Sequence, residues 1–136
     1  GGLSFGISIV ENARREAIEE ANIPEILTQN LRYAGALHNN VEEGKSIRQE
    51  RLFTFDLQLP AQFSPQINDG EVEEFLLLSP LEVKEHLLTG DAFKPNSGLI
   101  TLQFLLRWGL LDHLLTHREK EVLTQRLIAD DPITEN

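Results

Sequence analysis

Residues 1–24, GGLSFGISIVENARREAIEEANIP, place Glu16, Glu19 and Glu20 close together just behind Arg15. Positions i, i+3 and i+4 lie on one face of a helix, one turn apart. Three carboxylates on one face repel each other and weaken the helix by about 0.2–0.5 kcal/mol per pair. Mg²⁺ binds carboxylate oxygens together with substrate phosphates. The pattern therefore indicates a metal site for a phosphate ester or diphosphate, and a solvated acidic helix face is the alternative.

The sequence also predicts where this helix begins and ends. Ser8 and Glu11 form a capping-box pattern, so we expect the helix to begin at about Ile9. Asn22 tolerates the left-handed conformation that ends a helix, and Pro24 stops further propagation. A stripe of small apolar residues beside the acidic face predicts close packing on a sheet: Val10, Ala13, Ala17 and Ala21.

The segment REAIEEANI, residues 15–23, resembles the core of the Nudix box, R-E-U-x-E-E-x-G-U, in which U is a bulky aliphatic residue. This box is the signature of hydrolases that cleave nucleoside diphosphates linked to another moiety. The leading glycine of the pattern falls on Gly1. The chain departs from the pattern at three positions: Ile7 replaces the early acidic residue, Asn22 replaces the late glycine, and Ala17 is small for a U position.

The resemblance implies that Glu16, Glu19 and Glu20 bind Mg²⁺ or Mn²⁺, with Glu16 and Glu19 acting in catalysis. Bound metal would neutralise charge on the diphosphate and activate water near neutral pH. Arg15 lies four residues before Glu19 and is close enough to orient that carboxylate. An ordinary surface ion pair, worth little, is the alternative for Arg15.

Nudix enzymes often take a further acidic ligand from a loop beyond the sheet. The stretch NDGEVEE, residues 68–74, offers several carboxylates, and Glu71 is the first choice because it follows the glycine turn directly. A hydrated acidic turn is the alternative. Gly1 and Gly2 would let the backbone approach phosphate or metal closely, although glycine is also the default turn residue. Lys94, in the pattern FKPN, is a candidate phosphate contact or part of a helix-entry loop.

Two longer stretches, Arg51 to Pro80 and Ala92 to Asp112, resemble the thiamin-pyrophosphokinase-like subgroup of Nudix proteins. The resemblance covers roughly residues 1–127. This subgroup tends to carry a GISxxE-type loop, so Ile7 is a feature of the subgroup. The resemblance implies thiamine diphosphate or its oxidised analogues as substrate and the monophosphate as product. Two alternatives stay open: a Nudix hydrolase acting on ADP-ribose or a related diphosphate, and a non-catalytic Nudix-fold binding module.

The composition narrows the class of protein. The chain of 136 residues suits one domain, expected over residues 1–129 with a loose tail at 130–136. A net charge of −10 argues against nucleic acid as a partner, and the absence of cysteine excludes thiolate metal sites. We expect no membrane span because no apolar run approaches about 18 residues, and we expect a cytoplasmic protein because no signal peptide is visible. The sequence has no Met and begins inside the motif, so we expect a fragment that lacks the N-terminal strands of the domain.

The remaining patterns predict an α/β fold, a Nudix-type α/β/α sandwich with a mixed sheet. Alternation of Phe53, Phe55, Leu57 and Leu59 predicts a strand with that face strongly buried. Other expected elements are a short turn or helix at 24–29, strands at 31–39 and 71–78 with a hairpin turn around Gly44, and helices at 80–88, 97–109 and 113–129. The helix at 97–109 is apolar nearly all round, so we expect it and Trp108 to be mostly buried.

Overall fold

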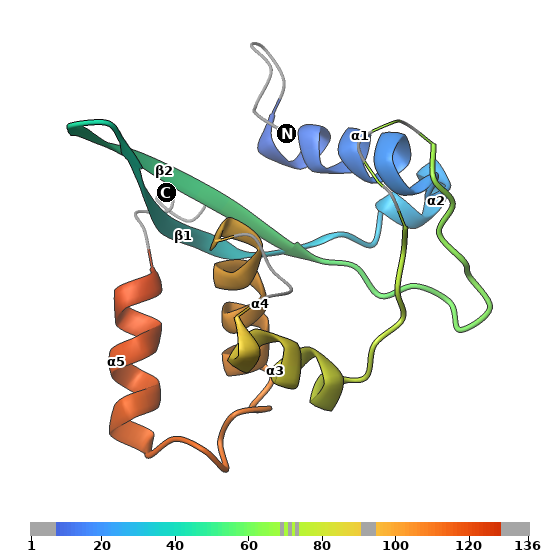
Figure 1. The fold of residues 1–136 in the computed structure, drawn as a ribbon. Coiled ribbons are helices and arrows are strands. Elements are labelled where there is room, and N and C mark those ends of the chain that lie inside the picture. Colours follow the sequence, from blue (N-terminus) through green and yellow to red (C-terminus); the bar gives the residue numbers. More distant parts are fainter. Residues whose placement is uncertain (1–7, 69, 71, 73, 91–94, 129–136) are drawn as a thin grey trace. The chain divides into compact units, whose positions relative to one another are not determined.

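The computed structural model describes residues 8–68, 70, 72, 74–90 and 95–128. Helices and strands combine in one α/β fold, which confirms the expected class (Figure 1). Their order along the chain is α1 (Ile9–Ala21), α2 (Glu25–Thr28), β1 (Arg32–Glu43), β2 (Ser46–Asp56), α3 (Pro80–Thr89), α4 (Pro95–Arg107) and α5 (His117–Leu127). None of the described helices is long and apolar enough to cross a bilayer.

The chain divides into two compact units. The first contains Gly1–Ala34 and Phe55–Leu77, and the second contains Gly35–Thr54 and Leu78–Asn136. The first unit therefore carries α1 and α2, whereas the second carries α3, α4, α5 and most of the β1–β2 hairpin.

Local capping interactions set the two ends of α1. The Ser8 hydroxyl accepts a hydrogen bond from the Glu11 N–H at 3.1 Å, so the helix begins at Ile9 as predicted. Asn22 follows the helix in the left-handed conformation, with φ 53° and ψ 37°, and its N–H donates to Ile18 at 3.0 Å. The short α2 confirms the expected helical connection after Pro24.

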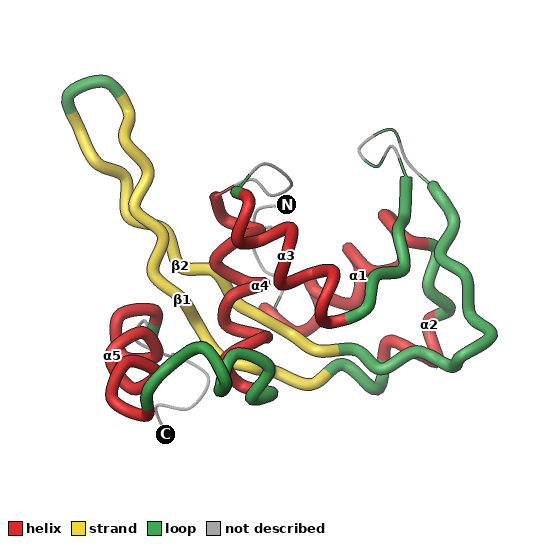
Figure 2. Tube along the Cα trace, turned by 60° about the horizontal axis from the view of Figure 1, so that its bottom comes forward, coloured by secondary structure: helices red, strands yellow, loops and turns green. Residues whose placement is uncertain are grey.

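The hairpin of β1 and β2 is antiparallel and turns at Gly44, whose φ of +61° suits glycine (Figure 2). Both the pairing and the turn residue were predicted. The predicted boundary at residue 39 was wrong, because β1 continues to Glu43. Two cross-strand side-chain contacts accompany the extra length: Asn39 donates to Glu50 at 3.0 Å, and Arg48 pairs with Glu43.

The prediction of which β2 face is buried was wrong. Thr54 is buried and donates its hydroxyl to the Gly35 carbonyl at 3.0 Å, and Leu52 packs on the core of the second unit. Phe53 and Phe55 are only half-buried. The alternation of apolar residues predicts a strand. It does not predict which face of the strand is buried when both faces carry apolar residues.

The strand expected at 71–78 is not formed in the described part of that segment, residues 72 and 74–78. Leu76 and Leu77 are exposed there, with relative accessibilities of 68% and 101%. A strand needs a neighbour to accept its hydrogen bonds, and the sheet of the described residues has only the two strands β1 and β2. Within these residues the expected mixed sheet is therefore a two-stranded antiparallel one.

The second unit packs its three helices around leucine side chains. A capping box between Ser79 and Glu82 begins α3, and Gly90 ends it with φ +77°, as predicted. The buried core consists of Leu37, Leu105, Leu106, Leu111 and Leu127.

Two expectations for the C-terminal helices were wrong. The predicted burial of α4 holds only on the Leu105 and Leu106 side, because Trp108 is 60% exposed and Phe104 is 38% exposed. The last helix begins at His117, and not at residue 113, because Thr116 caps it through Glu119. Gly109, with φ +68°, lies in the turn that precedes it.

Candidate functional site

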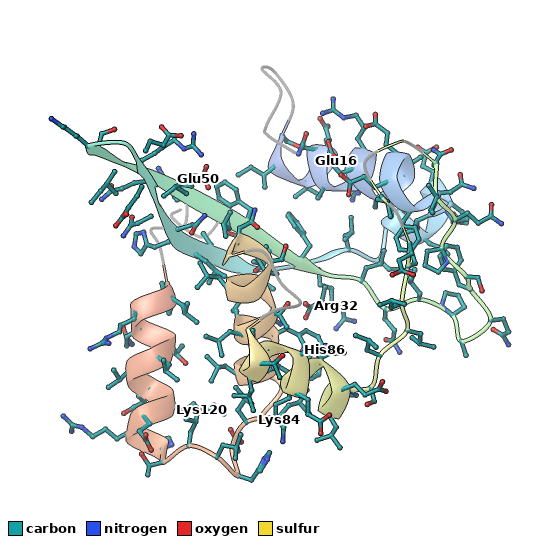
Figure 3. All side chains as sticks on the ribbon, in the orientation of Figure 1. Glu16, Arg32, Glu50, Lys84, His86 and Lys120 are labelled. Atoms are coloured by element: carbon teal, nitrogen blue, oxygen red, sulfur yellow. The ribbon has the colours of Figure 1, made fainter. Side chains whose placement is uncertain are left out.

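Helix α1 carries the predicted acidic residues, and Figure 3 labels Glu16 on it. The Glu16 side chain is 24% exposed and the Glu19 side chain is 54% exposed. Glu20 is half-buried. The helix spacing thus puts all three carboxylates within one turn of each other, as the sequence pattern required.

Arg15 contacts the carboxylates of Glu16 and Glu19. Its Nη2 lies 3.9 Å from Glu16 Oε1, and its Nε lies 3.8 Å from Glu19 Oε1. One guanidinium therefore bridges Glu16 and Glu19 and offsets part of their mutual repulsion. Both separations are at the long end for ion pairs, so their electrostatic contribution is small.

A residue that sequence reasoning missed fixes the guanidinium more firmly. Arg15 Nη2 donates to Asn12 Oδ1 at 2.9 Å, and Asn12 is only 7% exposed. The signal was present in the sequence, since Asn12 precedes Arg15 by three positions and so shares its helix face. Asn12, Arg15, Glu16 and Glu19 form a continuous polar network along α1.

The chemistry of this donor set suits a hard divalent cation, because carboxylate oxygens are the ligands that Mg²⁺ and Mn²⁺ prefer. Among the described residues, however, no three His, Asp or Glu side chains converge in a metal-binding arrangement. Arg15 contacts Glu16 and Glu19.

A loop far along the chain meets the end of α1. The Gln66 N–H donates to the Ala21 carbonyl at 3.1 Å, and Asn68 Nδ2 donates to the Ile18 carbonyl at 3.4 Å. Asn22 Nδ2 also donates to Gln66 Oε1 at 3.3 Å. These three bonds join positions 44 to 50 residues apart, and no local sequence pattern predicts them.

Several predicted site residues lie outside the described part of the chain: Gly1, Gly2, Glu71 and Lys94. Glu74 is described and exposed. His113 lies near Lys84, at 3.1 Å between Nε2 and Nζ, and His117 lies 4.0 Å from Glu121. These histidines therefore contact side chains of the second unit, which does not contain the α1 network.

Three known proteins resemble this chain in sequence. Nudix hydrolase 24, chloroplastic, and Nudix hydrolase 20, chloroplastic, both from Arabidopsis thaliana, are each 34% identical to it over 111 residues, which cover 82% of this chain. An uncharacterized protein of Saccharomyces cerevisiae is 32% identical over 123 residues. No protein-family profile matches the chain.

The similarity to the two Arabidopsis hydrolases supports placing this chain in the Nudix superfamily. The chain spans 30% of the length of each of these hydrolases and 36% of the yeast protein. The relatives thus support the superfamily that the box residues indicated, and they leave its thiamin-pyrophosphokinase-like subgroup as a prediction.

Proposed function

We propose that this chain is the Nudix-box portion of a metal-dependent hydrolase that cleaves a diphosphate linkage. The observation that carries the proposal is the α1 network, in which Arg15 lies beside Glu16 and Glu19 on one turn of the helix. Similarity to two proteins named as Nudix hydrolases supports it.

In this proposal Glu16, Glu19 and Glu20 hold Mg²⁺ or Mn²⁺. The cation would neutralise diphosphate charge and lower the pKa of a bound water. Arg15 orients the Glu16 and Glu19 carboxylates, and Asn12 holds Arg15 in place. One glutamate accepts the proton of the attacking water; the water oxygen bonds to a phosphorus, and the bond from that phosphorus to the bridging oxygen breaks.

The loop after Gln66 is our candidate for an additional ligand, Glu71. Its described neighbour Asn68 is hydrogen-bonded to α1 at Ile18, one position before Glu19. Gly1, Gly2 and Lys94 remain candidates for contacts to the substrate phosphates.

For the substrate we propose thiamine diphosphate or its oxidised analogues, on the resemblance of residues 51–80 and 92–112 to the thiamin-pyrophosphokinase-like subgroup. Hydrolysis would release thiamine monophosphate, or its oxo form, and inorganic phosphate. The net charge of −10 does not oppose such a small anion, because the cation would carry the compensating charge.

The test is product detection with the full-length protein on thiamine diphosphate, oxothiamine diphosphate and ADP-ribose, each with Mg²⁺ and with chelator. We expect metal-dependent release of the thiamine monophosphates. Turnover of ADP-ribose alone would retain the hydrolase and exclude the thiamine substrate. A folded protein that turns over none of the three would contradict the proposal and favour a non-catalytic binding module.

A further inference from the structure

Three side-chain amides connect α1 to the loop that follows residue 65, and we name Asn22, Gln66 and Asn68 the amide latch. Asn22 Nδ2 donates to Gln66 Oε1 at 3.3 Å, and Asn68 Nδ2 donates to the Ile18 carbonyl at 3.4 Å. The backbone N–H of Gln66 donates to the Ala21 carbonyl at 3.1 Å. All of these groups belong to the first compact unit.

The latch acts on the part of α1 that most needs partners. The last four carbonyl groups of a helix have no N–H donor inside the helix. They accept hydrogen bonds from capping groups, side chains or water instead. Ile18 and Ala21 are among these four positions, and Glu19 and Glu20 lie between them. The Ile18 carbonyl already accepts from the Asn22 N–H at 3.0 Å, so the Asn68 amide is its second donor. The latch thus fixes the turn that carries two of the three clustered carboxylates.

Asn22 is the position at which this chain departs from the late glycine of the Nudix pattern. Its φ of 53° and ψ of 37° are left-handed, a conformation that glycine adopts without strain and asparagine tolerates. Glycine would therefore end the helix equally well, but it has no amide to donate to Gln66. The structure gives the asparagine a second task that the family glycine cannot perform.

We propose that the amide latch is a positioning device for the acidic face of α1: Asn22 and Asn68 hold the last turn so that Glu19 and Glu20 bind a divalent cation together. This inference rests on the proposed function. Neither amide touches the cation or the substrate. Their contribution is the fixed backbone from which the carboxylates project, since supporting hydrogen bonds of this kind tune the affinity of a metal site.

Two substitutions each delete one side-chain bond of the latch and leave the helix cap and the Gln66 backbone bond in place. Asn22→Gly keeps the left-handed C-terminal residue and deletes only the amide, and Asn68→Ala deletes the bond to Ile18. Asn30→Ala is the matched control, because Asn30 is also exposed and lies in the same unit. Asn68→Gln retains an amide donor and serves as the conservative rescue.

The first readout is hydrogen exchange of residues 17–23 in the full-length protein, which needs no metal or activity. We expect exchange to quicken about fivefold in Asn22→Gly and Asn68→Ala, the effect of losing one hydrogen bond, and to stay unchanged in Asn30→Ala. Unchanged exchange in both latch variants would overturn the inference.

The second readout is the dissociation constant for Mn²⁺, measured by electron paramagnetic resonance. We expect it to rise about fivefold in Asn68→Ala and to recover in Asn68→Gln. Faster exchange with unchanged Mn²⁺ affinity would reduce the latch to a structural role and overturn the proposal. If the wild-type protein does not bind Mn²⁺, both the latch proposal and the proposed function are wrong. If the wild-type protein hydrolyses its substrate and the variants bind Mn²⁺ with normal affinity, only the latch proposal is wrong.

Discussion

Replacing Arg15 tests which of its contacts matters most. The contacts of Arg15 include a hydrogen bond to Asn12 at 2.9 Å and ion pairs with Glu19 at 3.8 Å and Glu16 at 3.9 Å. A hydrogen bond to a charged group contributes about 1.5–3 kcal/mol, and an exposed ion pair contributes about 0–1 kcal/mol. Asn12 is 7% exposed, so its Oδ1 would lose its partner in a nearly dry environment. We expect Arg15→Ala to lower the free energy of unfolding by about 1.5–2 kcal/mol, mostly through Asn12.

Two double-mutant cycles separate these contributions. The cycle of Arg15→Ala with Asn12→Ala should give a coupling energy of about 1.5 kcal/mol, with little dependence on salt. The cycle of Arg15→Ala with Glu19→Gln should give less than about 0.5 kcal/mol and vanish at roughly 1 M salt. Urea unfolding, followed by circular dichroism and extrapolated linearly to water, supplies each free energy.

The opposite ranking of the two coupling energies would contradict the dominant role of Asn12. A large, salt-sensitive coupling between Arg15 and Glu19 would mean that the carboxylate, and not the buried amide, holds the guanidinium. The Asn12 hydrogen bond would then not be the main constraint on the Arg15 side chain.

Three further predictions concern the core, a helix cap and the proposed chemistry. Leu105 is fully buried, so Leu105→Ala should cost about 2–5 kcal/mol of unfolding free energy, whereas Leu114→Ala, at a 51% exposed site, should cost no more than about 0.5 kcal/mol; equal losses in urea denaturation would contradict the core assignment. Hydrogen bonds from the Ser79 backbone and side chain lower the pKa of Glu82, so this carboxylate stabilises the fold above its unfolded pKa, and that stabilisation is lost as the pH falls through the lowered folded value. Glu82→Gln should remove this pH dependence from melting curves measured from pH 6 down to about pH 3, and an unaltered curve would speak against the cap. If the hydrolase proposal holds, Glu16→Gln should reduce kcat by roughly a hundredfold or more while substrate still binds in equilibrium dialysis, and retained turnover would exclude Glu16 from catalysis.

The ends of two helices and the turn of the hairpin could be predicted from the sequence, because they depend on residues a few positions apart. Helix α1 begins after Ser8 and ends at Asn22, helix α3 begins after Ser79 and ends at Gly90, and the hairpin turns at Gly44. In each case a cap or a positive φ angle involves groups only a few positions apart, so a short window of sequence contains the whole interaction. The clustering of Glu16 and Glu19 around Arg15 was predictable for the same reason, because helix geometry fixes neighbours at i+3 and i+4.

Tertiary structure decided everything that required a distant partner. The pattern at 71–78 is typical of a strand, yet its described residues pair with no other strand. Burial of Thr54 and exposure of Trp108 depend on which face other elements cover. The amide latch joins Asn22 to Gln66 across 44 residues, a contact that no periodicity encodes. Local hydrogen bonds depend on residues a few positions apart. Burial and long-range pairing depend on segments that are distant in the sequence and come together only in the folded chain.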